Sequence, residues 1–238
     1  MGTEIYHING IGDVKFTRRK GSQKVTMRVK PDGIVSVNYP WFTSKKELLN
    51  FIIDNSHWIA ERKKKISSSK IAFAYGDEIK TLLRSIRIEK TESGRLRGIV
   101  RQDEVAILVP INSNIENETT QKFIAKVIVE VCRNDAKKYL PRRVATLANM
   151  HSLKYNKVYI KNLKSKWGSC SSMLNINLSL HLMRLPTHLI DYIILHELAH
   201  TVELNHSDRF WDFLNKLTNG RAKTLNKEMK MYRDIVRS

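Results

Sequence analysis

Hydrophobic and polar residues alternate in several short runs over the first half of the chain, and this period of two predicts β-strands. Residues 24–30 carry valine or methionine at every second position, and residues 34–39 form another extended run after the sequence Pro-Asp-Gly at 31–33. Proline sets the first dihedral angle of such a turn and glycine accepts the positive φ that closes it, so we expect a hairpin here. Further candidate strands are residues 79–89, 97–101 and 105–109.

A helical period occurs in the same region, between residues 44 and 65. Leu48, Ile52 and Ile59 recur there on one face. Lysines at 63–65 suit a helix C-terminus, where cations meet the negative end of the macrodipole. Residues 1–110 are therefore expected to form a small β-rich part with one helix.

Longer helical segments distinguish the second part, residues 111–238. Hydrophobic residues follow a helical period from about residue 116 to 139. Pro141 is expected to break this helix before a second piece that ends near Met150, because proline lacks the N–H that a helix interior needs. The mixture of strands and helices predicts an α+β fold.

Two strands and three helices are expected after residue 150. The second strand, residues 174–180, could be an edge to which an extended peptide adds a strand, although a core strand would have the same pattern. An apolar helix starts near Thr187, which we expect to be its N-cap. The other elements are a strand at 157–161 and helices at 207–218 and from 226 onward.

The apolar helix carries the motif His-Glu-x-x-His, formed by His196, Glu197 and His200. Residues four apart lie on the same helix face, so both imidazoles can bind one ion. Zinc suits such a site, because three protein ligands leave one tetrahedral position for water, and Glu197 could accept a proton from that water. The alternative is a buried histidine pair satisfied by backbone groups, which would be costly on so apolar a helix.

A third zinc ligand has two candidates. His206 follows His200 by six residues, so the helix must end before it for the ring to reach the ion, and Asn205 could supply a left-handed turn. Glu203 lies three residues after His200 on nearly the same face. We favour His206.

Composition places few limits on this picture. The chain has 238 residues, 42% of them hydrophobic, and no run approaches the roughly 18 to 20 apolar residues of a membrane helix. A signal-peptide core is absent, and Cys132 and Cys170 form no Cys-x-x-Cys pair, so neither a disulfide framework nor a cysteine zinc site is supported. We expect a cytoplasmic protein with no membrane partner.

The charge is strongly positive, with 42 lysines and arginines against 23 acidic residues and a net charge of +19. Such a field attracts nucleotides, nucleic acids or other acidic partners. A solvated basic surface that only aids solubility explains the same excess. The basic clusters lie at residues 15–30, 62–65 and 154–166.

These motifs together resemble the YgjP-like zinc metallohydrolases, which are related in motif to the SprT-like proteases. The resemblance rests on Lys-Trp-Gly-Ser-Cys-Ser at 166–171, the strand from Asn175, the His-Glu-x-x-His helix, Asn-His-Ser at 205–207 and Phe-Trp at 210–211. It implies a zincin-like metallopeptidase domain with His196, His200 and His206 as ligands and Glu197 as catalytic acid and base.

Candidate substrate contacts lie in the segment before the metal helix. Trp167 and Gly168 could form a cleft wall, since glycine permits close approach and tryptophan offers a flat surface. A packing element against the metal helix is the competing interpretation. The candidate contacts are Lys166, Trp167, Gly168, Ser169 and Asn177, and the candidate oxyanion donors are Lys166, Tyr192 and His188.

Our leading hypothesis is therefore a zinc-dependent metallopeptidase that hydrolyses peptide bonds in peptide or protein substrates, with Glu197 as general base. One alternative is a metal-dependent nucleoside-triphosphate (UTP) pyrophosphatase, an activity also attached to the group that this chain resembles. Another is a nucleic-acid-associated protease like the SprT proteins, with the basic surface as its anchor.

Overall fold

The computed structural model describes residues 3–30, 32–68, 73–92 and 94–232. The chain forms two compact units, residues 1–71 and 72–238. The boundary thus falls earlier than the expected boundary at residue 110. In the described residues, no helix has the length and apolar character needed to cross a membrane.

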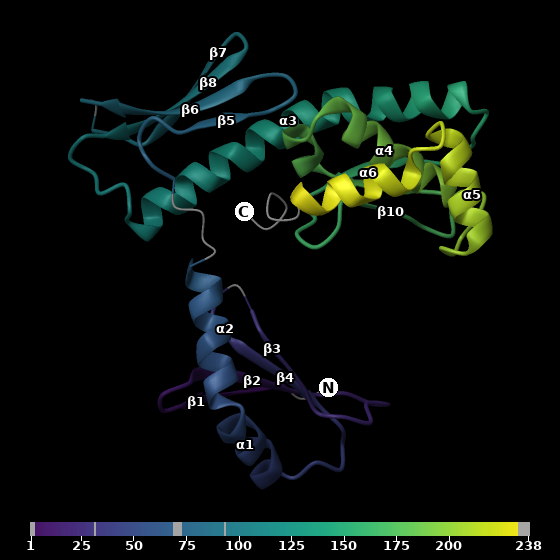
Figure 1. Ribbon diagram of the computed structural model, residues 1–238. Helices are drawn as coiled ribbons and strands as arrows, with labels where there is room; N and C mark the ends of the chain where they lie inside the picture. The colour runs from purple at the N-terminus through teal and green to yellow at the C-terminus, as the bar shows by residue number, and fades with distance from the viewer. Residues whose placement is uncertain (1–2, 31, 69–72, 93, 233–238) are drawn as a thin grey trace. The chain divides into compact units, whose positions relative to one another are not determined.

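The N-terminal unit contains a four-stranded sheet with the order β1-β2-β4-β3 (Figure 1). The predicted hairpin around residue 32 is confirmed: β3 and β4 are antiparallel, and Gly33 has a φ of 83°. Pro31, the other turn residue, lies outside the described residues. The strands are β1 (Thr3–Ile8), β2 (Gly12–Arg18), β3 (Thr26–Val29) and β4 (Val35–Tyr39).

Two helices, α1 (Lys45–Asp54) and α2 (Ser56–Ser68), replace the single helix predicted for this unit. Ser44 and Glu47 form a capping box at the start of α1. Helix α1 ends at Asn55, whose side-chain amide donates a hydrogen bond to the Phe51 carbonyl at 2.8 Å. Hydrophobic residues on both sides of the break enter the same core, so the helical period continues through it.

A second four-stranded sheet, of order β5-β6-β8-β7, belongs to the C-terminal unit. Its inner residues, including Ile86 and Ile107, share one core with Ile124 and Ile128 of the following helix. Burial against that helix explains why the unit boundary precedes this sheet. The strands are β5 (Glu78–Lys80), β6 (Ser85–Thr91), β7 (Arg97–Arg101) and β8 (Glu104–Pro110).

The helix after this sheet, α3 (Glu118–Met150), runs unbroken for 33 residues, so the predicted break at Pro141 is wrong. Ala136, Leu140 and Val144 are fully buried on either side of the proline. Lys137, whose carbonyl loses its helical partner, is exposed, so water can satisfy that carbonyl. Packing on both sides therefore holds the helix through the proline.

A third sheet has the order β10-β11-β9, formed by β9 (Val158–Lys161), β10 (Gly168–Cys170) and β11 (Ile176–Ser179). The predicted strand at 174–180 corresponds to β11. Because β11 is the middle strand and pairs with both neighbours, the expectation that it offers a free edge is wrong. The edges of this sheet are β10 and β9.

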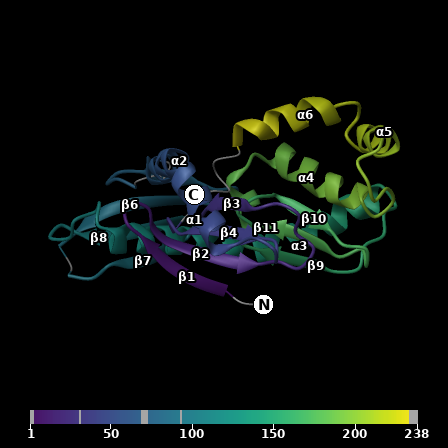
Figure 2. The ribbon, with the colours of Figure 1, turned by 90° about the horizontal axis from the view of Figure 1, so that it is seen from below.

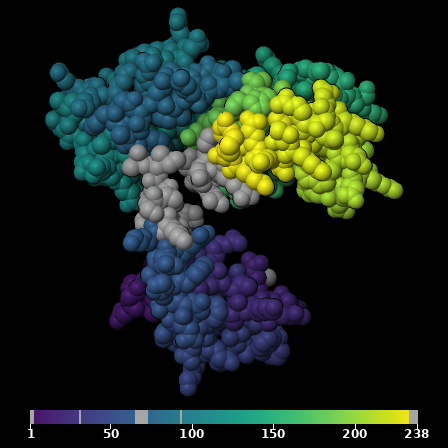
Figure 3. Space-filling model, viewed as in Figure 1, coloured from purple at the N-terminus to yellow at the C-terminus, as the bar shows by residue number. Residues whose placement is uncertain are grey.

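The remaining helices surround α4 (Thr187–Ala199). Figures 1 and 2 both show α4 between α3 and the C-terminal helix α6 (Ala222–Met229), and α4 also contacts α5 (Asp208–Leu217). In the space-filling view the yellow atoms of the C-terminal helices lie against the green atoms of residues that precede them in the chain (Figure 3). Pro186, not Thr187, occupies the N-cap position of α4.

Candidate active site

Helix α4 is buried over most of its length, and the polar residues of the His-Glu-x-x-His motif lie at its C-terminal end. Nine of its thirteen residues are buried, among them Leu189, Ile194 and Leu198. His196 and Glu197 lie in the last turn, and His200 is the C-cap. The apolar burial fixes the helix, so the side chains at its end have defined positions.

Three imidazoles converge at this end of α4. The Nε2 atom of His206 lies 3.1 Å from Nε2 of His196 and 3.2 Å from Nε2 of His200. Two nitrogens that each lie roughly 2.0–2.1 Å from a tetrahedral zinc ion are about 3.3 Å apart, so this spacing fits zinc. His206 is exposed, which leaves the site open to water and substrate.

The orientation of His200 separates the two candidates for a third ligand. Its Nδ1 atom lies 3.0 Å from the backbone carbonyl oxygen of Glu203, so an Nδ1–H donated there leaves the Nε2 lone pair free for an ion. Glu203 therefore meets the site through its backbone, and among the described residues the group of side chains that could hold an ion consists of His196, His200 and His206. Asn205 does not adopt the expected left-handed conformation, since its φ is not positive.

Phe210 forms the packing surface behind the three rings. Its ring stacks on His200 with centroids 4.4 Å apart, and it meets His196 and His206 edge-on at 5.0 and 4.8 Å. In the sequence, Phe210 stands out only as part of the Phe-Trp pair at 210–211. Phe210 lies in the first turn of α5, and its short separation from His206 was the available signal for a contact with the triad.

Burial keeps His196 and His200 in the form that binds metals. Burial, together with the charges that His200 and His206 would carry, lowers the pKa of His196 to about 3. Burial also lowers the pKa of His200. Neutral imidazole is the ligand form, so these two rings need not lose a proton before they bind an ion at neutral pH.

Glu197 is held against strand β10. A Cβ atom at Gly168 would lie only 2.6 Å from Oε1 of Glu197 and 2.7 Å from its Cγ, so the carboxylate occupies the space that a side chain at residue 168 would need. The backbone N–H of Cys170 hydrogen-bonds the carboxylate, while Oε2 is buried without a hydrogen-bond partner. Burial raises the pKa of Glu197 to about 8, against the opposing effects of Lys166 and the Cys170 N–H.

A cleft of about 500 Å³ opens beside His196 and Glu197. Of the predicted substrate contacts, Lys166, Trp167 and Gly168 line it. Ser169 and Asn177 do not: they face each other across β10 and β11, and the Asn177 amide donates to the Ser169 carbonyl at 3.2 Å.

Two of the three candidate oxyanion donors, Lys166 and Tyr192, line this cleft. Burial raises the pKa of Tyr192 to about 12, so its phenol keeps the proton that a donor needs. His188 lies outside the cleft lining, where its Nε2 atom is 2.8 Å from Glu228 of α6.

An ion pair that the sequence analysis did not find fixes α4 to α3. Arg143 donates two hydrogen bonds to Asp191, at 2.7 and 2.6 Å. Asp191 lies five residues before His196, so the pair sets the rotation of α4 relative to its neighbour. The partners are 48 residues apart, and no local pattern could have joined them.

The convergent histidines and adjacent carboxylate are the features of a metal-dependent hydrolase. The chain belongs to the YgjP-like family, since the family model described as "YgjP-like, metallopeptidase domain" matches residues 23–232. Its class is therefore that of the metal-dependent peptidases.

Among solved structures, the metallopeptidase zymogen of Pyrococcus abyssi abylysin is similar, with 24% sequence identity and a TM-score of 0.35. The similarity covers 38% of this chain and 91% of that chain. No curated protein matches the sequence.

Proposed function

We propose that this protein is a zinc-dependent metallopeptidase in which His196, His200 and His206 hold the ion and Glu197 is the general base. The observation that carries the proposal is the convergence of three Nε2 atoms next to a buried carboxylate oxygen that has no hydrogen-bond partner. A zinc ion held there would polarise the peptide carbonyl and lower the pKa of water.

The residues of the chain supply the remaining parts of the reaction. Glu197 accepts the proton of the attacking water and delivers it to the leaving amine, a role suited to a carboxyl whose pKa lies near neutral pH. Tyr192 or Lys166 donates a hydrogen bond to the oxygen that develops charge, since both line the cleft.

Peptide hydrolysis has more support than attack on a nucleotide. Within the described ranges, the histidine triad is the one group of three or more histidine, cysteine or acidic side chains that could hold an ion. A second, acidic group that would bind the magnesium of a nucleoside triphosphate is missing from the same ranges. A nucleic-acid partner for the basic clusters stays a prediction.

The proposal is tested with purified protein by measuring bound zinc, cleavage of unfolded casein and pyrophosphate release from UTP. We expect about one equivalent of zinc and casein cleavage. Glu197→Gln should keep the zinc and lower turnover by about 10²–10⁴-fold, because it removes the general base.

Single alanine substitutions at His196, His200 and His206 should each lower the zinc content steeply, while His57→Ala, an exposed histidine of the N-terminal unit, should not. If His206→Ala keeps its zinc and Glu203→Ala loses it, the assignment of His206 as the third ligand is wrong. UTP hydrolysis that depends on Glu197, with casein intact, would contradict the peptidase assignment.

A further inference from the structure

Three lysines line the cleft next to Glu197 and the histidine triad. Lys164 and Lys166 come from the segment between β9 and β10, and Lys230 directly follows α6. All three are exposed. The cleft thus presents cations from two separate elements, near the carboxylate that we propose as general base.

The cleft contains little negative charge to balance these cations. Glu197 is the one acidic residue in its lining, and it is buried. Among the described residues, none of the three lysines forms an ion pair. An incoming anion would therefore meet three cations and one acidic lining residue, the buried Glu197, which interacts electrostatically with Lys166.

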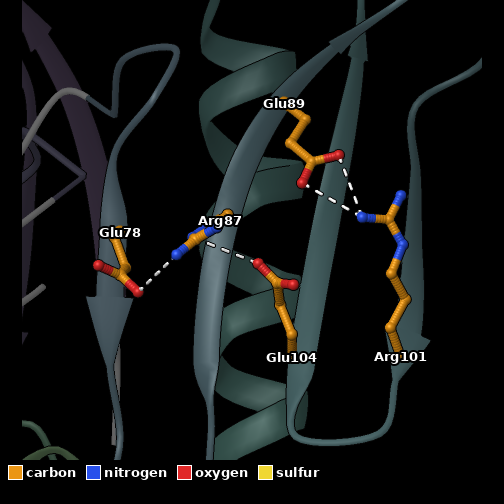
Figure 4. A network of polar contacts seen from close by, with 5 residues as sticks. All are labelled: Glu78, Arg87, Glu89, Arg101 and Glu104. Carbon is orange, nitrogen blue, oxygen red and sulfur yellow. Dashed lines mark hydrogen bonds and ion pairs between the residues drawn. The ribbon is translucent and has the colours of Figure 1, made fainter.

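Some basic side chains of the same unit are neutralised by acidic neighbours in the second sheet. There Arg87 lies 3.5 Å from Glu78 and 3.3 Å from Glu104, and Arg101 lies 3.3 Å from Glu89 (Figure 4). Cross-strand pairs of this kind neutralise both partners.

Lys164, Lys166 and Lys230 form no such pair among the described residues. Exposed lysines elsewhere in the described part of the unit, such as Lys154, also lack one, so the distinguishing feature of these three is that they line one cleft together beside Glu197.

Apolar walls give the cleft a second property. Trp167, Ile193 and Met229 line it beside the lysines. A glutamate or aspartate side chain matches both features, since its methylene groups pack on apolar atoms while its carboxylate meets an ammonium group. The net charge of +19 would also attract such a substrate over long range.

We infer that the cleft selects peptides with acidic residues next to the scissile bond, through Lys164, Lys166 and Lys230. The inference rests on the proposed peptidase function, and it names the substrate class of that site. Lys164 and Lys230 are specificity-determining residues that contact substrate side chains, and Lys166 combines this role with its candidate role as a donor to the developing oxyanion.

A binding measurement tests the inference without turnover. Zinc-loaded Glu197→Gln protein is titrated into two fluorescent peptides of equal length, one with glutamate and one with glutamine at the positions that flank a central apolar pair. Anisotropy should show about tenfold tighter binding of the glutamate peptide at low salt, and the difference should shrink as salt is added.

Two triple variants with the same loss of charge distinguish the effect of the cleft lysines from the effect of the overall positive charge. Lys164→Gln, Lys166→Gln and Lys230→Gln together should abolish the preference for the glutamate peptide. Lys154→Gln, Lys157→Gln and Lys223→Gln together change exposed lysines of the same unit that do not line the cleft, and the preference should remain. The inference would be overturned if the Glu197→Gln protein with its native lysines binds both peptides equally. It would also be overturned if both triple variants lower the preference for the glutamate peptide equally.

Cleavage of the same peptides by the wild-type protein tests the proposed function separately. If glutamate and glutamine peptides are cleaved with equal kcat/KM, the peptidase proposal stands and the inference fails. If neither peptide is cleaved while the lysine-dependent binding difference persists, the selectivity of the cleft stands and the peptidase proposal fails.

Discussion

The helices of the two compact units differ in how completely they are buried. In the N-terminal unit, α1 buries only Leu48 and Ile52 against its sheet, and its other side faces solvent. In the C-terminal unit, α4 is packed by α3, α5, α6 and the third sheet, and nine of its residues are buried. A helix enclosed in this way can hold ring nitrogens to the few tenths of an ångström that a metal site needs.

The pockets of the two units differ in whether their cationic side chains already have partners. The N-terminal unit has a pocket of about 360 Å³, lined by aromatic rings and by Arg18 and Lys45. Arg18 already donates to the Trp41 carbonyl, and Lys45 lies over the Tyr6 ring, so these cations are occupied. In the C-terminal cleft, Glu197 Oε2 has no hydrogen-bond partner and the lysines form no ion pair among the described residues, so these groups are available to a ligand.

The largest expected effect is on the C-terminal unit, through Gly168→Ala. The new Cβ would displace the Glu197 carboxylate, and such a misplacement should lower kcat by about 100-fold. Zinc content should not change, because the three atoms nearest to the new Cβ all belong to Glu197. The control is Gly94→Ala, where a Cβ meets nothing within 4 Å and kcat should be unaffected. Normal turnover in Gly168→Ala would show that the carboxylate needs no such support.

A pH effect on stability should come from His181 in the same unit. Burial lowers its pKa from the ordinary 6.5 to about 4, with smaller contributions from Arg184 and Lys164. Between these values the unfolded chain binds a proton that the folded chain does not, so the free energy of unfolding falls as pH drops from about 6.5 to 4, by up to about 3 kcal/mol.

Urea unfolding at several pH values measures this dependence. His181→Gln should flatten it, because glutamine can donate to Asn162, the present partner of the His181 ring, and does not titrate. Comparing the free energy of unfolding of wild type and His181→Gln at each pH removes the contribution of His196, His200 and His206, because both proteins contain them. Parallel curves for the two proteins would rule out His181 as the source.

The ion pair between α3 and α4 should contribute a smaller amount. Arg143→Met leaves Asp191 half-buried and unpaired, which should lower the free energy of unfolding by about 2 kcal/mol. The matched control is Arg133→Met on the same helix. Arg133 Nε lies 3.3 Å from Oε1 of the exposed Glu130, so its loss should lower the free energy of unfolding by less than about 0.5 kcal/mol. Similar losses in both variants would show that burial of the pair is unimportant.

The smallest expected change in turnover concerns the N-terminal core. Ile52→Ala should destabilise the N-terminal unit by about 2–5 kcal/mol, yet leave kcat within about twofold at temperatures where both units are folded. Leu198→Ala removes a buried side chain next to Glu197 and should lower kcat as well as stability. A large loss of turnover in Ile52→Ala would mean that the first unit takes part in catalysis.

The sequence predicted local structure well where one pattern decides it. The hairpin strands β3 and β4, the strands β7 and β8, and the helix that carries His-Glu-x-x-His follow from residue spacing and turn chemistry. Strands β1 and β2 were not predicted, and the strand expected at 79–89 is divided into β5 and β6. Predictions failed where burial overrides local preference. Pro141 does not break α3, because buried residues on both sides hold the helix, and Asn55 divides a segment whose hydrophobic period is continuous.

By itself, the sequence determined which residues could bind a metal, since histidines four apart on a helix share a face whatever surrounds them. Only the tertiary structure decided that His206 reaches those histidines while Glu203 offers its carbonyl, and that Gly168 leaves room for Glu197. It alone also brought Lys164, Lys166 and Lys230 to one cleft. The physical reason is distance along the chain: contacts within one helical turn are set by local geometry, whereas these depend on how separate elements pack.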